Sequence, residues 1–476
     1  MKLDAKACYQ ALLTHDTRFD GMFFVGVAST GIYCRTVCTA RTPRPGNCSF
    51  YGTAAAAERA GYRPCLRCRP ELAPGTARVD AVDRLAAIAA GRIEDGALAE
   101  GGLDALAAEL GVSARHLRRV VERAFGVTPV ELAQTSRLLL AKRLLTDTDL
   151  PITEIAFASG FASLRRFNAL FRERYRLNPT GLRKARTATS EQQTLTCELA
   201  YIAPFDWNAL LSFLQGRIGQ GVEAVEGGRY LRTLAVGEAR GWLSVAPTAG
   251  RDSLTVEVSL GLAAALRPIL ATIKRVFDLG ASSDHIAAHL GVLAADRPGL
   301  RVPGAFGGFE MGARAILGQQ VSVAAASTLS GRFHRRFGDP AQTPHVALTH
   351  LAASTSRVAS ADPAELVALG ILRSRAVSIV ALARALEEGR LVLAAGSDPE
   401  VTMAQLRELP GVGEWTAQYI AMRALGWPDA FPHTDLGIRK ALGSVSPRRV
   451  LEMAEAWRPW RAYAAMHLWK SLEIPG

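Results

Sequence analysis

The stretch LRELPGVGEWTAQYIAMRAL, residues 406–425, decides the fold of the C-terminal part of the chain. Two segments with helical periodicity flank its L-P-G-V-G, in which Gly411 and Gly413 permit a tight hairpin. The backbone N–H groups of such a hairpin face a phosphate group. The stretch therefore predicts a helix-hairpin-helix that binds the DNA backbone. Alone it does not identify an enzyme, because proteins without catalytic activity use the same motif to bind DNA nonspecifically.

An acidic residue and two further motifs accompany this hairpin. Asp435 lies 22 residues beyond Gly413, and the chain also contains FEMGARAILGQQVSVAAA (309–326) and WRPWRAYAAMHLWK (457–470). With these motifs, residues 194–472 resemble the AlkA-type 3-methyladenine DNA glycosylases of the helix-hairpin-helix superfamily. The resemblance implies an α+β fold, in which a β-containing subdomain precedes a helical domain.

The same resemblance assigns roles to individual side chains. It implies that Asp435 is the catalytic carboxylate and that Gly411, Gly413 and Gln320 contact DNA. Gln320 stands where members of this family often carry an intercalating leucine, and a glutamine packs less well between bases. Four aromatic side chains are expected to line the pocket for the damaged base: Phe213, Trp415, Tyr419 and Trp469.

These residue types suit the excision of an N-alkylated purine of the 3-methyladenine type. Such a base carries positive charge, and an aromatic face attracts a cation by roughly 0.5–2 kcal/mol. A carboxylate beneath the sugar stabilises the developing oxocarbenium ion and helps to direct water, once the base has been flipped out of the duplex. Simple core packing is the alternative for the aromatic set, and an exposed carboxylate at a helix N-terminus is the alternative for Asp435.

Two absences narrow the expected chemistry. Bifunctional relatives carry a Schiff-base lysine just after the hairpin, where this chain has Trp415, and no cysteine follows Cys197. We therefore expect a monofunctional, hydrolytic glycosylase without an iron–sulfur cluster. The sequence leaves open whether a monovalent cation binds at the hairpin. The residue directly after Asp435 is Leu436, and with this residue the sequence does not define the detailed shape of the pocket.

Four of the seven cysteines form two close pairs. Cys34-x3-Cys38 is followed by Cys65-x2-Cys68, which is the spacing of a four-thiolate zinc site. Ordinary buried cysteines are the alternative. The remaining three have no partner at ligand spacing and are expected in cores: Cys8, Cys48 and Cys197.

The cysteine segment GIYCRTVCTARTPRPGNCSFYGTAAAAERAGYRPCLRCRP resembles the Ada-type methyl-acceptor domain over residues 1–72. The resemblance implies that one Zn2+ is held by all four thiolates and that Cys34 irreversibly accepts a methyl group from a DNA methylphosphotriester. Methylation removes one negative charge, so we expect affinity for promoter DNA to rise. Six arginines near the cysteines are candidates for phosphate contacts: Arg35, Arg41, Arg44, Arg63, Arg67 and Arg69.

Two helix-turn-helix patterns lie between the cysteines and the glycosylase-like part. LDALAAELGVSARHLRRVVERAFG has a turn at Gly111 and an N-cap at Ser113, and a second unit repeats this with Gly160 and Ser163. With the closing RYRLNPTGLR, residues 82–186 resemble the AraC-type DNA-binding domain. The basic helices offer these side chains to DNA: Arg115, Arg118, Arg119, Arg165, Arg166 and Asn168.

Composition fits a multidomain protein that binds nucleic acid. The chain has 476 residues and a net charge of +12, and 15 basic against 6 acidic side chains give residues 112–186 a charge of +9. A charge run is often just a solvated face, but this one favours a polyanionic partner. The N-terminus lacks an apolar signal segment and no apolar run spans a membrane, so we expect a cytoplasmic, nucleoid-associated bacterial protein.

The whole sequence predicts a mainly α multidomain fold in four parts, which are a small α/β zinc domain (1–75), an all-α double helix-turn-helix (80–186), a β-containing subdomain (194–285) and a helix-hairpin-helix domain (286–476). The expected function joins methyl acceptance, transcriptional regulation and base excision.

 We expect one chain that senses DNA methylation, regulates transcription together with RNA polymerase, and excises alkylated bases from double-stranded DNA. Two alternatives stay open: a regulator whose glycosylase-like half only binds DNA, and a glycosylase whose zinc domain is only structural. Direct repair of O6-alkylguanine is not expected, because the chain has no Pro-Cys-His-Arg motif.

Overall fold

The computed structural model describes residues 4–16, 19–73, 84–148, 150–183, 194–394 and 397–472. Of the two connectors expected from the sequence, residues 74–80 and 187–193 lie outside the described residues. The chain forms two compact units. The first unit comprises Met1–Ala203, Pro247–Lys274 and Leu279–Ser282, and the second comprises Pro204–Ala246, Arg275–Asp278 and Ser283–Gly476.

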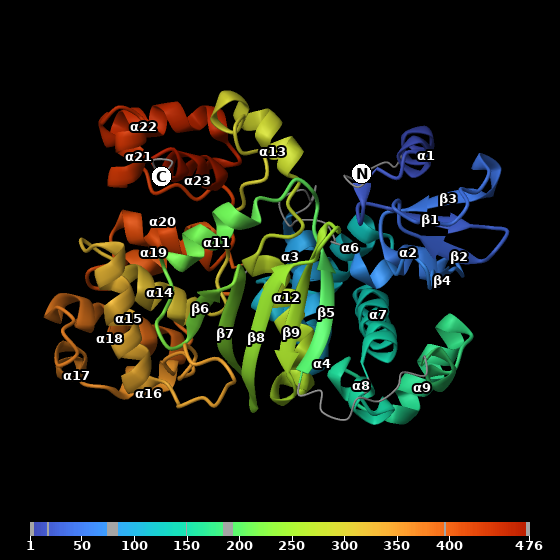
Figure 1. Cartoon of the computed structure of the whole chain (residues 1–476), viewed down its shortest axis with the longest axis horizontal. Coiled ribbons are helices and arrows are strands. Elements are labelled where there is room, and N and C mark those ends of the chain that lie inside the picture. The colour runs from blue at the N-terminus through green and yellow to red at the C-terminus, as the bar shows by residue number, and fades with distance from the viewer. Residues whose placement is uncertain are drawn as a thin grey trace. The chain divides into compact units, whose positions relative to one another are not determined.

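The first unit begins with a small α/β layer (Figure 1). Its sheet has the order β3-β1-β2-β4, with β1 Phe24–Val27, β2 Ile32–Cys34, β3 Cys48–Tyr51 and β4 Arg63–Pro64. β1 is antiparallel to β2 and β3, whereas β4 is parallel to β2, with Ile32 opposite Arg63. Helix α1 (Ala5–Leu13) buries Cys8 against Phe23, and α2 (Ala54–Arg59) begins at the N-cap Thr53.

Helices follow in the order expected for two helix-turn-helix units. They are α3 Arg84–Asp95, α4 Ala97–Glu100, α5 Gly102–Glu109, α6 Ala114–Phe125, α7 Pro129–Asp147, α8 Ile152–Ala158, α9 Leu164–Tyr175 and α10 Pro179–Leu182. Both turns contain a glycine with positive φ, +67° at Gly111 and +86° at Gly160. Ser113 and Ser163 cap α6 and α9 by accepting a backbone N–H at 3.2 Å. The two predicted turn-and-cap patterns are confirmed.

Buried polar contacts join the cysteine-bearing layer to α7 within the first unit. The carboxylate of Glu58, on α2, accepts hydrogen bonds from Tyr33 Oη at 3.1 Å and from Thr135 Oγ1 at 2.8 Å. Glu71 forms an ion pair of 2.6 Å with Lys142, and both side chains are at most 2% exposed. Separating this buried ion pair would leave an uncompensated charge in the interior, so the pair holds the segment of Glu71 against α7.

The predicted β-containing part begins with two strands in the first unit. β5 (Thr194–Ala200) is antiparallel to β9 (Ser253–Ser259), with Thr194 opposite Ser259. In the second unit, β6 (Glu223–Glu226), β7 (Arg229–Val236) and β8 (Ala239–Pro247) form an antiparallel meander. Its buried Arg232 pairs with Glu223 and Glu310, and although burial opposes it, the charges of Arg232 and Arg314 lower the pKa of Glu223 to about 2.

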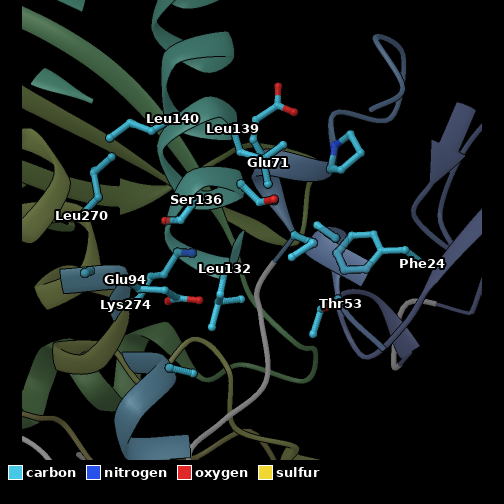
Figure 2. Close-up of a pocket in the computed structure, with 18 of the residues that line it drawn as sticks. Phe24, Thr53, Glu71, Glu94, Leu132, Ser136, Leu139, Leu140, Leu270 and Lys274 are labelled. Atoms are coloured by element: carbon cyan, nitrogen blue, oxygen red, sulfur yellow. The ribbon is translucent and has the colours of Figure 1, made fainter. Parts of the chain in front are cut away.

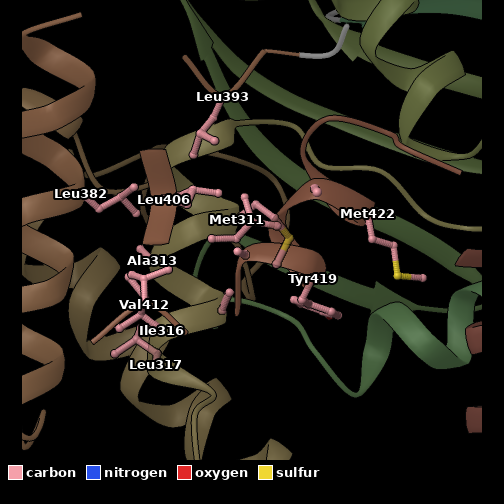
Figure 3. Close-up of a cluster of buried hydrophobic side chains, with 14 of the residues drawn as sticks. Met311, Ala313, Ile316, Leu317, Leu382, Leu393, Leu406, Val412, Tyr419 and Met422 are labelled. Atoms are coloured by element: carbon pink, nitrogen blue, oxygen red, sulfur yellow. The ribbon is translucent and has the colours of Figure 1, made fainter. Parts of the chain in front are cut away.

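Helices dominate the rest of the chain, as expected. Their bounds are α11 Trp207–Gln215, α12 Leu266–Val276, α13 Ser283–Leu290, α14 Gly308–Leu317, α15 Val323–Phe337, α16 Thr355–Ser360, α17 Pro363–Val367, α18 Arg373–Glu387, α19 Pro399–Arg407, α20 Glu414–Arg423, α21 Leu436–Ala441, α22 Pro447–Ala454 and α23 Arg461–Lys470. Figure 3 shows Ile316 of α14 among the apolar side chains of the core, with Leu382 of α18, Leu406 of α19 and Met422 of α20. This core fixes the hairpin between α19 and α20. No helix in the described residues has the length and apolar character needed to span a membrane.

Glu58 makes the first unit sensitive to pH. Burial raises the pKa of its carboxyl group to about 7, from an ordinary value of 4.5. Between these values the folded state holds a proton that the unfolded state has lost, so rising pH lowers the free energy of unfolding, by about 3 kcal/mol in total. We expect hydrogen exchange at the amides of α7 to accelerate from pH 5 to pH 7.5, after correction for its intrinsic rate.

The Glu58→Gln variant should lose this extra acceleration, because an amide does not titrate. Glu122→Gln is the control, since Glu122 is exposed on α6 and should leave the pH dependence unchanged. Equal pH dependence in the wild-type protein and in Glu58→Gln would contradict the assignment.

Candidate functional site

The four paired cysteines converge at one end of the first sheet. β2 ends at Cys34, and because β4 runs parallel to it, Cys65 follows β4 at the same end. The N–H of Cys65 donates to the carbonyl of Tyr33 at 3.0 Å. The sulfur atoms of Cys34, Cys38, Cys65 and Cys68 all lie within 4.8 Å of one another. The prediction that the two pairs meet is confirmed.

The cluster has the donor set and the spacing of a zinc site. Four sulfurs at 2.3 Å from a tetrahedral zinc ion are about 3.8 Å apart, which lies within the observed limit. Backbone N–H groups of Arg35 and Arg67 donate to the sulfurs of Cys68 and Cys65, both at 3.3 Å. Cys38 is 4% and Cys65 6% exposed, whereas Cys34 is half-buried and therefore more accessible.

The thiols alone do not favour negative charge on all four sulfurs. Hydrogen bonds from Cys34, and then from Cys38 and Cys68, lower the pKa of Cys65. The hydrogen bond with Cys34 also lowers the pKa of Cys38, to about 7, whereas hydrogen bonds with Cys38 and Cys65 raise the pKa of Cys34, and those with all three other cysteines raise the pKa of Cys68. Two thiolates are thus stabilised at the expense of the other two, and a divalent cation is what would stabilise all four together.

The arginines around the cysteines divide into two groups. Arg35 is 8% exposed and pairs with Asp20, with Nε at 2.8 Å from Oδ1. Arg69 pairs with Glu71 and with Asp147, at 3.1 and 2.7 Å. These two arginines hold the fold, which corrects the expectation that they contact phosphate. Arg63 is half-buried, and three arginines are exposed near the cluster: Arg41, Arg44 and Arg67.

The three unpaired cysteines do not join the cluster. Cys8 and Cys197 are buried, as expected. Cys48 is half-buried and packs against the core that contains Cys8, and its thiol donates to the carbonyl of Arg44 at 3.4 Å.

In the second unit, Asp435 is held by three N–H donors. It is the N-cap of α21, and its Oδ1 accepts from the N–H of Ile438 at 3.0 Å. Trp469 Nε1 donates to Oδ1 at 2.9 Å, and Trp415 Nε1 donates to Oδ2 at 2.8 Å. Both carboxylate oxygens are therefore fixed. The backbone N–H at the start of α21 and the two indole N–H groups thus set the orientation of this carboxylate.

The four predicted aromatic side chains gather around this carboxylate. Trp415 and Tyr419 stack, with centroids 5.2 Å apart and planes 8° apart, and Tyr419 meets Trp469 edge-on at 6.1 Å. Phe213 stacks on Trp469 at 6.2 Å. Two of the four are nearly buried, Phe213 at 5% and Tyr419 at 8% exposure, so Trp415 and Trp469 offer the accessible ring surface.

Two arginines that the sequence analysis did not single out lie among these rings. Arg217 lies 3.8 Å above the centre of the Phe213 ring, and Arg423 donates to Tyr419 Oη at 2.9 Å. Although burial opposes it, Arg423 lowers the pKa of Tyr419. A cavity of about 210 Å³ lies beside Phe213 and Trp469 and is also lined by Arg217. No local sequence signal marks these arginines, because their partners are distant in the chain.

The hairpin between α19 and α20 has the predicted form. Gly411 has a φ of +73°, and a Cβ there would lie 2.4 Å from Ser378 Oγ, so only glycine fits. Gly413 has an ordinary φ of −91° and is the N-cap of α20, without a side-chain cap. Its role is therefore to leave the start of α20 open rather than to make the turn.

Gln320 lies in the loop before α15, close to this hairpin. It is exposed, and its φ of +52° is unusual for a residue with a side chain. The preceding Gln319 donates to the carbonyl of Gly411 at 3.0 Å and to Thr416 Oγ1 at 2.9 Å. The loop is thereby fixed to the hairpin, with Gln320 at its surface.

The predicted DNA-reading side chains lie on the two capped helices of the first unit. On α6, Arg115, Arg118 and Arg119 are exposed, and on α9, Arg165 and Arg166 are exposed. Asn168 is half-buried. The basic helices thus present an arginine-rich surface.

Four family models match successive parts of the chain. They are the metal binding domain of Ada at residues 7–71, a helix-turn-helix domain at 106–185, the AlkA N-terminal domain at 196–307, and the HhH-GPD superfamily base excision DNA repair protein at 313–460.

Similar proteins are known along the whole chain. A "probable bifunctional transcriptional activator/DNA repair enzyme AlkA" of Mycobacterium tuberculosis is 39% identical over 487 residues, which cover 99% of this chain and 97% of that protein. "DNA-3-methyladenine glycosylase 2" of Escherichia coli is 39% identical over 268 residues, 56% of this chain and 94% of that protein. The solved 3-methyladenine DNA glycosylase of Archaeoglobus fulgidus shares the fold, with a TM-score of 0.51, 21% identity and coverage of 58% of this chain and 97% of that one.

The cysteine cluster predicts a defined metal content. The purified protein should contain one zinc ion per chain by elemental analysis, and Cys65→Ser should reduce this content strongly, because a hydroxyl is a poor replacement for a thiolate ligand. Cys48→Ser is the matched control and should retain the metal, since Cys48 lies outside the cluster. Full zinc content in Cys65→Ser would contradict the site.

Proposed function

The chain belongs to the family of bifunctional transcriptional activator/DNA repair enzymes of the AlkA type, and we propose that it combines three activities. It excises N-alkylated purines from DNA, it accepts methyl groups from methylphosphotriesters at Cys34, and it regulates transcription in response. The observation that supports the excision activity most strongly is the carboxylate of Asp435, which Trp415 and Trp469 fix beside their own half-buried rings.

We place the flipped base against Trp415 and Trp469. Their rings are half-buried and lie next to the carboxylate, so a cationic base would gain from the ring faces while its sugar lies near Asp435. The cavity beside Phe213 is a less suitable place, because the cations Arg217 and Lys470 line it. Phe213 and Tyr419 then support the pocket from behind.

The excision step follows from this geometry. As the glycosidic bond breaks, its electron pair neutralises the departing cationic base and the sugar becomes an oxocarbenium ion. Asp435 stabilises that ion and directs water to the anomeric carbon, and the proton that the water loses passes to the carboxylate or to solvent. The indole of Trp415 occupies the place of a Schiff-base lysine, so we propose hydrolysis alone, without strand cleavage.

We propose that Gln320 enters the duplex when the base is flipped. Its exposure, its positive φ and the attachment of Gln319 to the hairpin support this role. The open N-terminus of α20 at Gly413, with the turn at Gly411, would bind a nearby phosphate, with or without a monovalent cation.

Methyl transfer is proposed for Cys34, the more accessible of the ligands on β2 and its following turn. Zinc held by Cys34, Cys38, Cys65 and Cys68 would keep the sulfurs as thiolates. The Cys34 sulfur then forms a bond to the methyl carbon while the bond from that carbon to the phosphate oxygen breaks, and the oxygen keeps the electron pair. The phosphodiester is restored, the thioether is stable, and each chain reacts once.

Regulation is proposed to follow from the change of charge. Methylated Cys34 carries one negative charge less, so repulsion from the DNA backbone falls. The arginines of α6 and α9 would then bind promoter DNA more tightly, and RNA polymerase is the proposed partner there. We propose the domain limits 1–75, 80–186, 194–285 and 286–476, and a place on the bacterial nucleoid in the cytoplasm.

Base release tests the role of Asp435. The Asp435→Asn variant should release 3-methyladenine from methylated DNA at least about a hundredfold more slowly, because an amide cannot stabilise the oxocarbenium ion by charge. Asp284→Asn is the matched control, since Asp284 is also an acidic residue at the start of a helix and is exposed. Unchanged release by Asp435→Asn would remove this carboxylate from the mechanism. Tight DNA binding without release by the wild-type protein would leave a regulator whose second half only binds DNA.

Label transfer tests the role of Cys34. DNA with labelled methylphosphotriesters should transfer one label per chain to Cys34, and Cys34→Ser should accept none. Cys48→Ser should accept the label normally, and circular dichroism reports whether each variant is folded. Retention of label transfer in Cys34→Ser would contradict the role of Cys34 as the acceptor. Unchanged promoter affinity after methylation would contradict the regulatory role and favour a zinc domain that is only structural.

A further inference from the structure

A cavity of about 210 Å³ lies within the first unit, away from the four cysteines. The cysteine-bearing layer, α7 and α12 supply most of its lining, and α3 and β5 also contribute (Figure 2). Phe24, Thr53 and Glu71 come from the cysteine-bearing layer, α7 contributes Leu132 and Ser136 among others, and α12 contributes Leu270 and Lys274. None of the activities proposed above uses it.

The walls of this cavity are mainly apolar. Leu132, Leu139 and Leu140 of α7 face it, together with Leu199 of β5 and Leu270 of α12. An apolar cavity of about 150 Å³ is large enough to hold benzene. The observed volume therefore fits a six-membered ring, or a chain of similar size, with one small polar group attached.

Two buried arginines among the lining residues have unused hydrogen-bond donors. Arg143 is 3% and Arg267 7% exposed, and neither Nε atom has a hydrogen-bond partner. The Nε of Arg143 is 3.9 Å from Asp147, too far for a hydrogen bond, and Asp147 already pairs with Arg69 at 2.7 Å. Each guanidinium donates from Nη2 to a backbone carbonyl, Arg143 to Glu198 and Arg267 to Ile93, but a buried N–H group without an acceptor is costly, so an acceptor in the cavity would stabilise both Nε atoms.

The charge around the cavity is also positive. Lys274 lines it as well, and of the two acidic lining residues Glu71 is engaged by Lys142 at 2.6 Å, while Glu94 is exposed. Burial and then the neighbouring Arg137 lower the pKa of Arg267 to about 10, so Glu94 and Asp95, which act in the opposite direction, compensate this guanidinium only in part. The group that completes the cavity is therefore an anion.

We propose that this cavity binds a small organic carboxylate with an apolar ring or short chain. The carboxylate accepts hydrogen bonds from Arg143 and Arg267, and the apolar part lies against the leucines of α7 and α12. Since the ligand contacts the cysteine-bearing layer, α7 and α12 at once, it stabilises their arrangement. The site is a means by which a metabolite could alter DNA binding by the first unit, and it does not depend on the chemistry at Cys34 or Asp435.

Titration calorimetry on the full-length, zinc-loaded protein tests the proposal. The probes are benzoate and hexanoate, each compared with a neutral analogue of similar size, benzyl alcohol and hexan-1-ol, and with inorganic phosphate. We expect one carboxylate per chain, with the alcohols and phosphate binding at least tenfold more weakly. Equal binding of the alcohols, binding of phosphate as tight as that of benzoate, or no binding of either carboxylate at millimolar concentration would overturn the proposal.

Variants locate the site. Arg267→Met should weaken benzoate binding roughly tenfold to a hundredfold, because it removes a charged donor but keeps a side chain of similar length. Ser136→Leu and Ala271→Leu fill the cavity without removing a charge, and each should abolish binding. Arg335→Met removes an exposed arginine of α15 and should leave binding unchanged. Circular dichroism confirms that each variant is folded, and benzoate affinity that survives in Arg267→Met or in both filled variants would contradict the site.

Discussion

The carboxylate of Asp435 is fixed between two indole N–H groups and the backbone N–H at the start of α21. These hydrogen bonds depend on how the helices of the second unit are arranged. Trp415 is on α20, directly after the hairpin, and Trp469 is on α23 near the end of the described chain. The contact therefore forms only when the hairpin, α21 and α23 are all in place. The core between α14, α18 and α20 supplies that rigidity (Figure 3).

The two proposed reaction centres solve one problem in different ways. Each places a negatively charged group beside an electron-poor carbon, which is the anomeric carbon at Asp435 and the methyl carbon at Cys34. In each centre, N–H groups donate to the charged atoms. At Asp435 the donors are two indoles and a backbone N–H, whereas the sulfurs of Cys65 and Cys68 receive backbone N–H groups from Arg67 and Arg35. Buried ion pairs such as Glu71 with Lys142 hold the surrounding elements in place.

Much of this was predictable from short-range patterns in the sequence. Cysteine spacing predicted the cluster, and the glycine and serine signals at Gly111 and Ser113 predicted the turn and the cap, because these depend on neighbours along the chain. Long-range pairing was not predictable. Nothing in the sequence indicates that Arg35 pairs with Asp20, or that Arg217 covers Phe213, since such contacts exist only once distant segments meet.

The most direct test of the central contact is the single-turnover rate of 3-methyladenine release by the double variant Trp415→Phe/Trp469→Phe. Phenylalanine keeps an aromatic ring at both places but removes both N–H donors, so DNA affinity should stay within about twofold while the rate falls at least about a hundredfold. A rate within about threefold of the wild-type value would contradict the account, because Asp435 would then act without the two indole contacts.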